Sequence, residues 1–184
     1  ANNLANVNTT GFKRDRPVFE DLLYQNIRQA GGQTGADTNA ATGFMLGTGT
    51  RIVATEKIQS QGNMMATENA LDLAIEGPGL FQIVQADGTI AYTRDGGFKL
   101  SQDGELVTSQ GLLLQPQILV PAEAASVTVG SDGTVSAELA NGGGNQQLGQ
   151  IQIARFVNGA GLESLGQNLL RETTASGAPI ILVP

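Results

Sequence analysis

Beyond Thr50, apolar positions come in short runs, and residues typical of turns separate one run from the next. The runs have the length of β-strands, whereas an amphipathic helix needs apolar residues at a 3.6-residue period over roughly ten or more positions. The strands predicted from these runs are 51–55, 71–75, 80–84, 89–93, 98–100, 106–107, 112–114, 118–120, 127–129, 134–136 and 151–157. One later stretch, 162–170, has room for one or two helical turns at most. The pattern therefore predicts a mainly β fold.

Four Asp-Gly pairs punctuate this part of the chain, at Asp87-Gly88, Asp95-Gly96, Asp103-Gly104 and Asp132-Gly133. Two-residue hairpin turns require positive φ angles, which glycine adopts without steric cost and aspartate tolerates. We expect most of these pairs at the tips of such hairpins. Strands joined by tight hairpins pair antiparallel, so the expected architecture is a compact antiparallel β-rich domain of short hairpin-linked strands.

The first fifty residues follow a different pattern. Leu4 and Val7 have helical spacing ahead of Gly11, which predicts the end of a helix near the start of the chain. Over 17–30, an initial proline, early acidic residues, apolar side chains at helical spacing and a Gly-Gly pair just beyond are typical of a complete helix. Segment 31–49 has almost no charge and too little apolar surface to order itself, which indicates a flexible arm until a neighbour holds it.

Composition narrows the class of protein. The chain has 184 residues, 40% of them hydrophobic, which is enough to bury a core, and its 25 glycines favour turn-rich structure. The net charge is −7 and the largest cationic cluster is 13–16, so we expect no nucleic-acid partner. No window approaches the roughly 20 apolar residues of a membrane-spanning helix, so we expect no membrane insertion. Because the chain starts with neither an initiator Met nor a signal peptide, we expect a segment of a longer protein.

The residues that most often carry catalysis are missing. The sequence has no His and no Cys, which excludes catalytic triads, thiolate sites and ordinary zinc sites. Glu68, Asp72 and Glu76 have the acids for a carboxylate pair, but a strand over 71–75 would put them on a solvated face. Segment 101–106 is similar to the middle of a calcium loop and lacks the first acid and the closing Glu. We therefore predict no enzyme, with no catalytic, cofactor-binding or metal-binding residues and no cofactor.

A resemblance points to a family. Residues 1–14, ANNLANVNTTGFKR, resemble the signature that follows the N-terminal helix in the bacterial flagellar rod and hook proteins. Further segments resemble the distal rod members of that family in particular. These are 19–25, 47–51, 92–96, 161–164 and 176–179. Segment 24–43 is similar to a stretch that distal rod proteins carry and hook proteins lack, and which the family ties to a straight, stiff rod.

The resemblance implies a structural subunit of the flagellar distal rod, which assembles helically into the drive shaft between motor and hook. It implies export through the type III apparatus without a cleaved signal, and a place in the periplasm within the basal body. The implied partners are copies of itself, other rod and hook subunits, the ring bushing around the rod and the export machinery. The residues implied in self-assembly are Asn2, Asn3, Leu4, Asn6, Thr10, Gly11, Phe12, Lys13, Phe19, Leu22, Leu23, Tyr24 and Ile27.

The resemblance also divides the chain. The expected parts are a helix end with the family signature (1–12), an extended rod-type arm (13–50), a β-rich core domain (51–175) and a truncated linker (176–184). Local rules favour a helix over 17–30, whereas the resemblance implies an extended arm or long hairpin pinned by neighbouring subunits. The expected arm is thus extended or partly helical, and we favour the extended form.

Two features depart from the family. Its long terminal helices are absent here, which indicates a core segment, and residues 180–184 do not match the turn-rich linker expected after Pro179. Two alternatives stay open at this point. One is a hook or proximal rod subunit of the same family, and the other is a carbohydrate-binding or carbohydrate-processing β domain, which the acidic residues and the polar Asn and Gln surface would suit.

Overall fold

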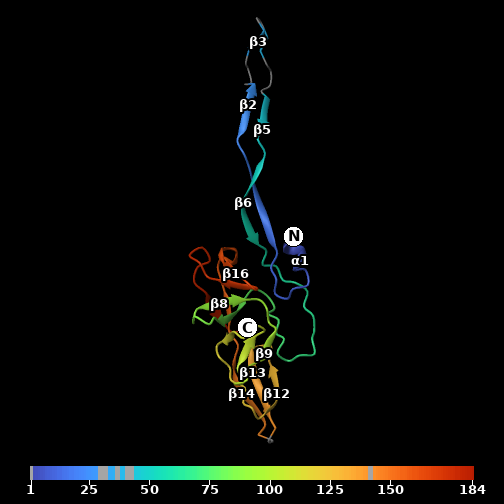
Figure 1. Ribbon diagram of the computed structural model, residues 1–184, viewed down its shortest axis with the longest axis vertical. Helices are drawn as coiled ribbons and strands as arrows, with labels where there is room; N and C mark the ends of the chain where they lie inside the picture. The colour runs from blue at the N-terminus through green and yellow to red at the C-terminus, as the bar shows by residue number, and fades with distance from the viewer. Residues whose placement is uncertain (1, 29–32, 36–37, 40–43, 141–142) are drawn as a thin grey trace. The chain divides into compact units, whose positions relative to one another are not determined.

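The computed structural model describes residues 2–28, 33–35, 38–39, 44–140 and 143–184. The chain forms two compact units. One unit, which we call the body, combines residues 1–14 and 58–184, and the other, which we call the ribbon, is 15–57. Both units consist mainly of antiparallel strands, which confirms the expected fold class (Figure 1).

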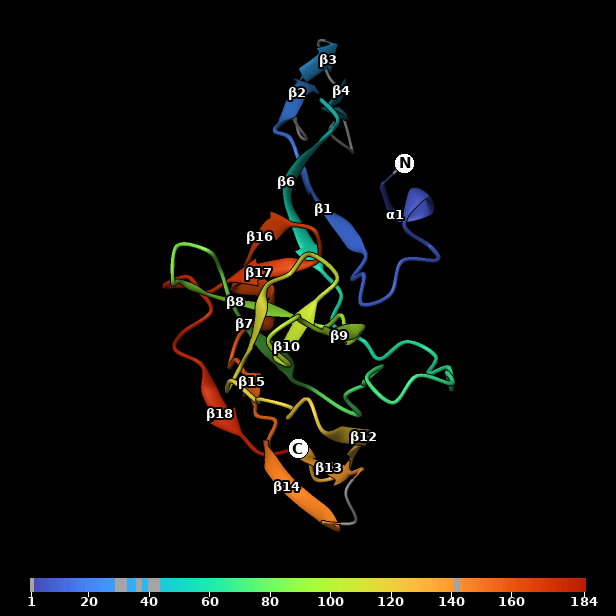
Figure 2. The ribbon, with the colours of Figure 1, turned by 60° about the horizontal axis from the view of Figure 1, so that its bottom comes forward.

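The body contains two sheets in its described residues. Its elements are α1 (Asn2–Ala5), β7 (Leu80–Val84), β8 (Ile90–Thr93), β9 (Phe98–Leu100), β10 (Leu106–Thr108), β11 (Leu113–Gln115), β12 (Ala124–Val129), β13 (Thr134–Leu139), β14 (Asn145–Gln150), β15 (Ile153–Arg155), a 3₁₀ turn (Gly159–Gly161), β16 (Glu163–Gly166), β17 (Leu169–Arg171) and β18 (Ile180–Leu182). The larger sheet runs β16-β17-β8-β7-β11-β10-β9, and β15 pairs with both β7 and β18. Strands β12, β13 and β14 form the second sheet (Figure 2).

Strand β7 lies at the centre of the body. It pairs with β8 on one edge and with β11 and β15 on the other, and four of its five residues are buried. Because side chains alternate across a strand, Phe81 packs in one apolar cluster and Leu80 in another. Edge-to-face ring pairs anchor each cluster: Phe81 with Phe98 at 5.1 Å between centroids, and Tyr92 with Phe156 at 4.8 Å. These clusters give the body a core of its own.

Three of the four Asp-Gly pairs lie in hairpins with three-residue loops rather than the expected two-residue turns. Between β7 and β8, the Gln85 amide donates to the Thr89 carbonyl oxygen at 2.8 Å, and the Gly88 amide donates back to Gln85 at 2.9 Å. The same bond pattern surrounds Gly104 and Gly133, and the three glycines have φ of 82°, 81° and 75°. A turn followed by a glycine in the left-handed region is the usual three-residue hairpin loop. The predicted glycine requirement is right at these sites, and the predicted loop length is wrong.

The fourth pair, Asp95-Gly96, is not a hairpin tip. Strands β8 and β9 on either side of it do not pair with each other in the described residues. Gly96 is instead required by a close approach, because a Cβ there would overlap the carbonyl oxygen of Leu73. The Leu73 amide also donates to the Gly96 carbonyl oxygen at 2.9 Å. The hairpin prediction is wrong here.

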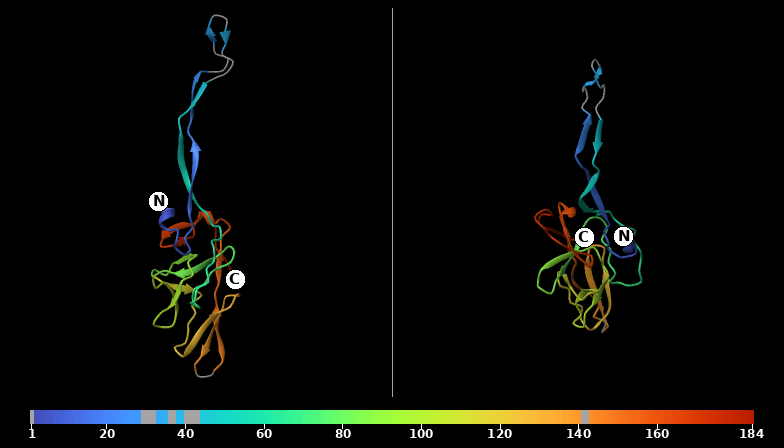
Figure 3. Two further views of the ribbon diagram at one scale, coloured as in Figure 1. Left: turned by 90° about the vertical axis from the view of Figure 1, so that its right-hand side faces the viewer. Right: turned by 45° about the horizontal axis from the view of Figure 1, so that its top comes forward.

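Among its described residues, the ribbon contains three antiparallel strand pairs, β1 with β6, β2 with β5, and β3 with β4. These are β1 (Asp15–Asp21), β2 (Tyr24–Arg28), β3 (Gln33–Gly35), β4 (Thr38–Asn39), β5 (Phe44–Gly47) and β6 (Thr50–Lys57). In both views of Figure 3, β1 and β6 lie side by side. The helix that local rules predict over 17–30 is wrong for the described residues, and the extended alternative is right. Cross-strand pairing outweighs helix propensity, which amounts to a few tenths of a kcal/mol per residue.

The predicted flexible arm over 31–49 falls partly on residues outside the described ranges. Inside those ranges, strands β3, β4 and β5 occupy part of it. The predicted helix end at the start of the chain is present as α1.

Three predicted elements differ from the structure. Segments 71–75 and 118–120 are irregular and touch neighbouring segments through isolated bridges at Asp72 and Leu119. Their apolar side chains still pack on the core. The apolar pattern that predicted strands there therefore reflects packing against the core rather than pairing in a sheet. Segment 162–170 is not helical: β16 and β17 form a hairpin across Gln167 and Asn168, which have φ of 53° and 61°. Two adjacent left-handed residues are incompatible with a helix and suit a tight hairpin turn.

Candidate assembly surfaces

The family signature forms a short, internally bonded segment at the start of the body. The Asn6 side-chain amide donates to the carbonyl oxygen of Asn2 at 3.0 Å and to its side-chain oxygen at 2.8 Å. The Thr9 hydroxyl donates to the side-chain oxygen of Asn6 at 3.1 Å. Asparagine is a poor helix-interior residue, but its side chain can satisfy free backbone groups where a helix ends. The Asn-rich composition therefore serves the turn after α1.

The end of the signature is fixed to the rest of the body. The Thr10 hydroxyl donates to the Asp95 carboxylate at 3.1 Å, and the Asn168 side-chain amide donates to the Thr10 carbonyl oxygen at 3.0 Å. Gly11 has φ of +68°, and a Cβ at this position would lie 2.6 Å from the Asp95 nitrogen. Only glycine fits that conformation and that approach without strain. Three segments far apart in the sequence thus meet at Thr10 and Gly11.

Lys13 lies beside Arg94 and binds backbone oxygens. The Lys13 ammonium donates to the Ser60 carbonyl oxygen at 2.8 Å. The Arg94 guanidinium donates to the carbonyl oxygens of Ile75 and Gly77 at 2.6 and 2.5 Å, and also to that of Gly79. Burial, followed by the positive charge of Arg94, lowers the pKa of Lys13, and burial lowers the pKa of Arg94. Both side chains hold the irregular segment 58–79 in place.

The signature also presents apolar side chains to solvent. Leu4 is 79% exposed and Val7 is 71% exposed, and Phe12 is half-buried. Asn3 is exposed on α1. Exposed leucine and valine on adjacent turns are the kind of surface that a partner covers, because burial of such side chains releases about 1.5–3 kcal/mol each.

The ribbon has one charged and one apolar face over β1 and β6. Residues that pair directly across two strands share a face, and successive residues alternate between faces. Arg16 pairs with Glu56 and Glu20 pairs with Arg51, both as ion pairs at 2.9–3.0 Å. Phe19, which alternates with these residues along β1, pairs with Ile52 on the opposite face.

The apolar face is open to solvent. Phe19 is 60% exposed and Ile52 is 63% exposed. Pro17, two residues before Phe19, belongs to the same face. The Asp15–Lys57 ion pair, at 3.0 Å, lies at the end of this face where β1 begins. The irregularity between Val18 and Phe19 places Val53 as an extra residue on β6 at the same level. A two-stranded ribbon offers no second layer to cover these side chains.

The other ribbon residues of the predicted set lie at and beyond the junction of β1 with β2. Leu22 is half-buried, and its amide donates to the Gly49 carbonyl oxygen at 2.9 Å. Leu23 is 88% exposed, and its carbonyl oxygen accepts the Thr48 hydroxyl. Tyr24 covers Gly47 across the strand pair, where a Cβ would lie 3.2 Å from its ring. Ile27 is in β2, and its side chain is outside the described part of the chain.

The predicted residues thus divide between the two units. Asn2, Asn3, Leu4, Asn6, Thr10, Gly11, Phe12 and Lys13 lie in the body, whereas Phe19, Leu22, Leu23, Tyr24 and Ile27 lie in the ribbon. In each unit they include large, exposed apolar side chains, together with polar groups that fix the local backbone.

The partners of the signature could not be found from the sequence alone. Arg94 and Asp95 lie in segment 92–96, which resembles the family, but nothing in the sequence showed that this segment meets residues 10–13. Asn168 carried one usable signal, because a Gly-Gln-Asn stretch between leucines is compatible with a tight turn. A second contact, between the family-like segments 161–164 and 176–179, was also not predicted from the sequence. Gly161 packs so closely that a Cβ on it would lie 2.7 Å from the Ser176 nitrogen. The Thr173 hydroxyl also donates to the Gly161 carbonyl oxygen.

The acidic residues considered for catalysis or metal binding do not gather. Asp72 accepts a hydrogen bond from the Asn69 side chain at 2.9 Å. In the described ranges, no group of three or more His, Cys, Asp or Glu is placed to hold a metal ion. The segment considered as a calcium loop is the β9–β10 hairpin loop, where the Ser101 hydroxyl oxygen accepts the amides of Asp103 and Glu105.

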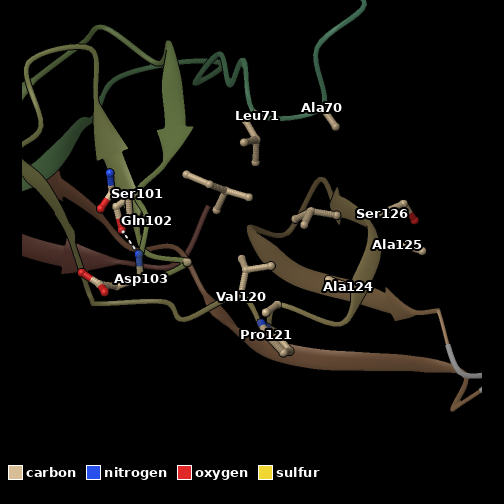
Figure 4. A pocket seen from close by; sticks show the side chains of 14 residues that line it. Ala70, Leu71, Ser101, Gln102, Asp103, Val120, Pro121, Ala124, Ala125 and Ser126 are labelled. Atoms are coloured by element: carbon tan, nitrogen blue, oxygen red, sulfur yellow. Dashed lines mark hydrogen bonds between the residues drawn. The ribbon is translucent and has the colours of Figure 1, made fainter.

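A cavity of about 470 Å³ lies beside that loop (Figure 4). One wall is the β9–β10 loop around Gln102 and Asp103, and the other is the start of β12 with Val120 and Pro121. Small apolar side chains such as Ala124 line much of it, without a converging set of polar groups.

No helix in the described residues is long and apolar enough to cross a membrane.

Comparison with known proteins agrees with the resemblance. The chain is 52% identical over 184 residues to the flagellar basal-body rod protein FlgG of Buchnera aphidicola from Schizaphis graminum, covering all of this chain and 71% of that protein. It is 48% identical over 186 residues to FlgG of Borreliella burgdorferi, with 100% and 70% covered. The flagellar hook protein FlgE of Helicobacter pylori is 45% identical over 119 residues, covering 62% of this chain and 16% of FlgE.

A domain family matches part of the body. Residues 74–137, from just before β7 into β13, match the family described as the flagellar hook protein FlgE/F/G D1 domain. That domain is shared by rod and hook proteins, whereas these matches over the whole of this chain, ribbon included, are to rod proteins. The chain therefore belongs to the FlgG family of flagellar basal-body rod proteins.

Proposed function

We propose that this chain is a structural subunit of the flagellar distal rod, which assembles helically with copies of itself into the rigid shaft that transmits motor torque to the hook. The observation that carries the proposal is the similarity to FlgG proteins over the whole chain, ribbon included. Matching to a hook protein covers only 62% of the chain. The distal rod is therefore preferred to the hook within this family.

The ribbon supports a role in contacts between subunits. None of its residues with a described side chain is buried, and Phe19 and Ile52 form an exposed apolar pair on one face. Fixing a backbone residue costs about 1–2 kcal/mol of conformational entropy, which a two-stranded ribbon offsets poorly by itself. A neighbouring subunit that covers the apolar face would supply the missing burial. Leu4 and Val7 offer the body a second surface of the same kind.

The remaining expectations follow from membership of the family and stay proposals. The rod lies in the periplasm, its subunits pass the flagellar export apparatus without a cleaved signal, and other rod and hook subunits and the ring bushing are neighbours. The division into signature (1–12), arm (13–50), β-rich domain (51–175) and linker (176–184) is proposed on the same basis. The role is structural and non-enzymatic.

Substitution of the apolar ribbon face tests the proposal. In a strain lacking its own distal rod protein, the full-length protein with Phe19→Asp and Ile52→Asp should give no complete rods in electron micrographs of isolated basal bodies, and no swimming. The matched control is Glu20→Gln with Arg51→Gln on the opposite face, which removes an exposed ion pair and should leave rods and swimming intact. Normal rods from the first variant, or failure of the unaltered protein to form rods, would contradict the proposal.

A hook subunit is the second candidate, and the match to FlgE over part of the chain is what favours it. Transfer of segment 24–43 into a hook protein separates the two. If this stretch belongs to a straight rod, the recipient hook should become straight. A hook that stays curved would show that the stretch is not a stiffening element.

A further inference from the structure

The contacts of Thr10 and Gly11 form one connected network with a buried centre. Thr93 is 2% exposed, and its hydroxyl donates to the Asn168 carbonyl oxygen at 3.0 Å and accepts the Asp95 amide at 3.1 Å. The same Asn168 and Asp95 bind Thr10 from two sides. A buried hydroxyl with both a donor and an acceptor role fixes its neighbours more tightly than a solvated one would. We call Thr10, Thr93, Asp95 and Asn168 the clasp.

Steric fit reinforces the clasp. Gly11 approaches the Asp95 backbone so closely that a Cβ would lie 2.6 Å from its nitrogen and 2.8 Å from its Cα. Asn168 has φ of 61° in the tight turn between β16 and β17, which aims its amide at the signature. Strand β17 in turn pairs with β8, which carries Thr93. The clasp is therefore built on the sheet of the body.

A second set of contacts holds the start of segment 58–79, which lies beside the signature within the body. The Ile58 amide donates to the Arg14 carbonyl oxygen at 3.0 Å. Lys13 holds Ser60, and the Arg94 side chain donates to Gln61 at 2.6 Å as well as to backbone oxygens further along. The signature and segment 58–79 are thus both fixed through two consecutive residues, Arg94 and Asp95.

We propose that the clasp is a rigid joint that sets the direction in which segment 2–13 leaves the larger sheet of the body. This inference rests on the proposed function, because a subunit of a shaft must pass torque between its terminal segment and its β domain. A segment held only by its covalent chain would swivel about φ and ψ, and the torque would be lost as twist. Hydrogen bonds on two sides of Thr10, with Gly11 seated against Asp95, remove that freedom. Thr93, Asp95 and Asn168 are accordingly positioning residues for the signature.

Amide hydrogen exchange on this chain tests the joint directly. Thr10→Val removes the hydroxyl at nearly constant volume, and Asn168→Gly removes the side-chain donor while keeping a residue that tolerates positive φ. Each should speed exchange of the Thr9 and Phe12 amides by about tenfold, the scale expected for losing one net hydrogen bond. Thr10→Ser keeps the hydroxyl and should exchange like the unaltered chain. Thr134→Val is the matched control, because it removes an equivalent hydroxyl–carboxylate hydrogen bond, to Asp132 in the β12–β13 loop, and should leave exchange of the Thr9 and Phe12 amides unchanged.

The outcome in the core strands distinguishes a joint from general stabilisation. Exchange in β7 and β11 should be unchanged in every variant, since the clasp lies outside the two apolar clusters. Unchanged Thr9 and Phe12 exchange in both Thr10→Val and Asn168→Gly would overturn the proposal. A uniform rise over the whole body would also overturn it, because the residues would then serve folding rather than direction.

Swimming under load tests the role in torque. The double variant Thr10→Val with Asn168→Gly, placed in the full-length protein, should still form rods and swim in dilute medium, with a loss of swimming as viscosity is raised. Thr10→Ser should swim normally throughout. If the unaltered protein forms no rods, the proposed function fails. If rods form and the double variant swims as well as the unaltered protein at every viscosity, the joint is wrong and the proposed function stands.

Discussion

The body and the ribbon use the same secondary structure but differ in what orders them. The body buries two apolar clusters around β7, including Ile83 and Ala154, which have no exposed surface. In the ribbon, no residue with a described side chain is buried, and its large apolar residues are largely exposed. Backbone pairing alone gives a two-stranded ribbon marginal stability in water. The same alternation of residues thus makes a self-sufficient fold where a second layer exists, and an unpartnered surface where it does not.

The largest expected effect of this difference is on amide exchange. Amides in β7 and β8 should exchange only through near-global unfolding, whereas those in β1 and β6 should exchange through local opening of the ribbon. For a domain stability of at least about 5 kcal/mol, protection in the body should exceed that in the ribbon by about a thousandfold or more. Mass spectrometry of the isolated chain measures both. Equal protection in the two units would show that the ribbon is stable without a partner.

Truncation of one phenylalanine in each unit tests the same contrast in free energy. Phe98 is 1% exposed and packs edge-to-face against Phe81, so Phe98→Ala should lower the free energy of unfolding by about 3–5 kcal/mol. Phe19 is 60% exposed, so Phe19→Ala should change it by less than about 0.5 kcal/mol. Urea unfolding followed by circular dichroism gives both values. A comparable loss for Phe19→Ala would mean that its face is already covered within the monomer.

Glycine substitutions separate close packing from turn geometry. Gly96→Val places a Cβ into the Leu73 carbonyl, and Gly133→Val adds one at φ of +75° and 3.0 Å from the Ile151 oxygen, so each should cost about 1–3 kcal/mol. Gly49→Ala in the ribbon, at φ of +110° with open space around it, should cost about 1 kcal/mol and act on the ribbon alone. Thermal midpoints measure the first two, and ribbon amide exchange measures the third. Unchanged midpoints for both valine variants would be inconsistent with these conformations.

Alkaline titration should affect the body through Tyr92. Burial, with the charge of Glu172 and a hydrogen bond to it as smaller causes, raises the pKa of Tyr92 to about 12, against an ordinary value near 10. The unfolded chain therefore loses this proton first, and the body loses stability as pH rises from about 10 to 12. Tyr92→Phe should remove that part of the decline. Parallel stability curves for the two proteins over this range would contradict the assignment.

The smallest expected effect comes from the charged face of the ribbon. The Glu20–Arg51 ion pair is more than half exposed on both sides, so Arg51→Gln should change stability by less than about 1 kcal/mol, and less still at high salt. Amide exchange in β1 and β6 at low and high salt is the measurement. A larger, salt-resistant effect would show that the charged face is buried by a contact.

The sequence by itself determined the elements whose signal is local. The run at 80–84, apolar except for Gln82, predicts β7 with its bounds as observed, because it has the length of a strand and turn residues on both sides of it. Positive φ at Gly88, Gly104 and Gly133 is equally predictable, because turn chemistry is decided within about five residues. The lack of His and Cys, together with the signature at 1–14, is a property of the residues themselves and indicates the class of protein without any tertiary contact.

Tertiary structure decided the rest, because the deciding contacts join residues distant in sequence. Segment 17–30 has a local helix signature, yet its described residues form β1 and β2, because these strands pair with β6 and β5 later in the chain. Segment 71–75 alternates like a strand, yet it forms only an isolated bridge to Gly97 while its leucines cover the core. Thr10 meets Asp95 and Asn168 across 85 and 158 residues. No local propensity encodes such a meeting, since its free energy arises only when the sheet of the body has brought all three together.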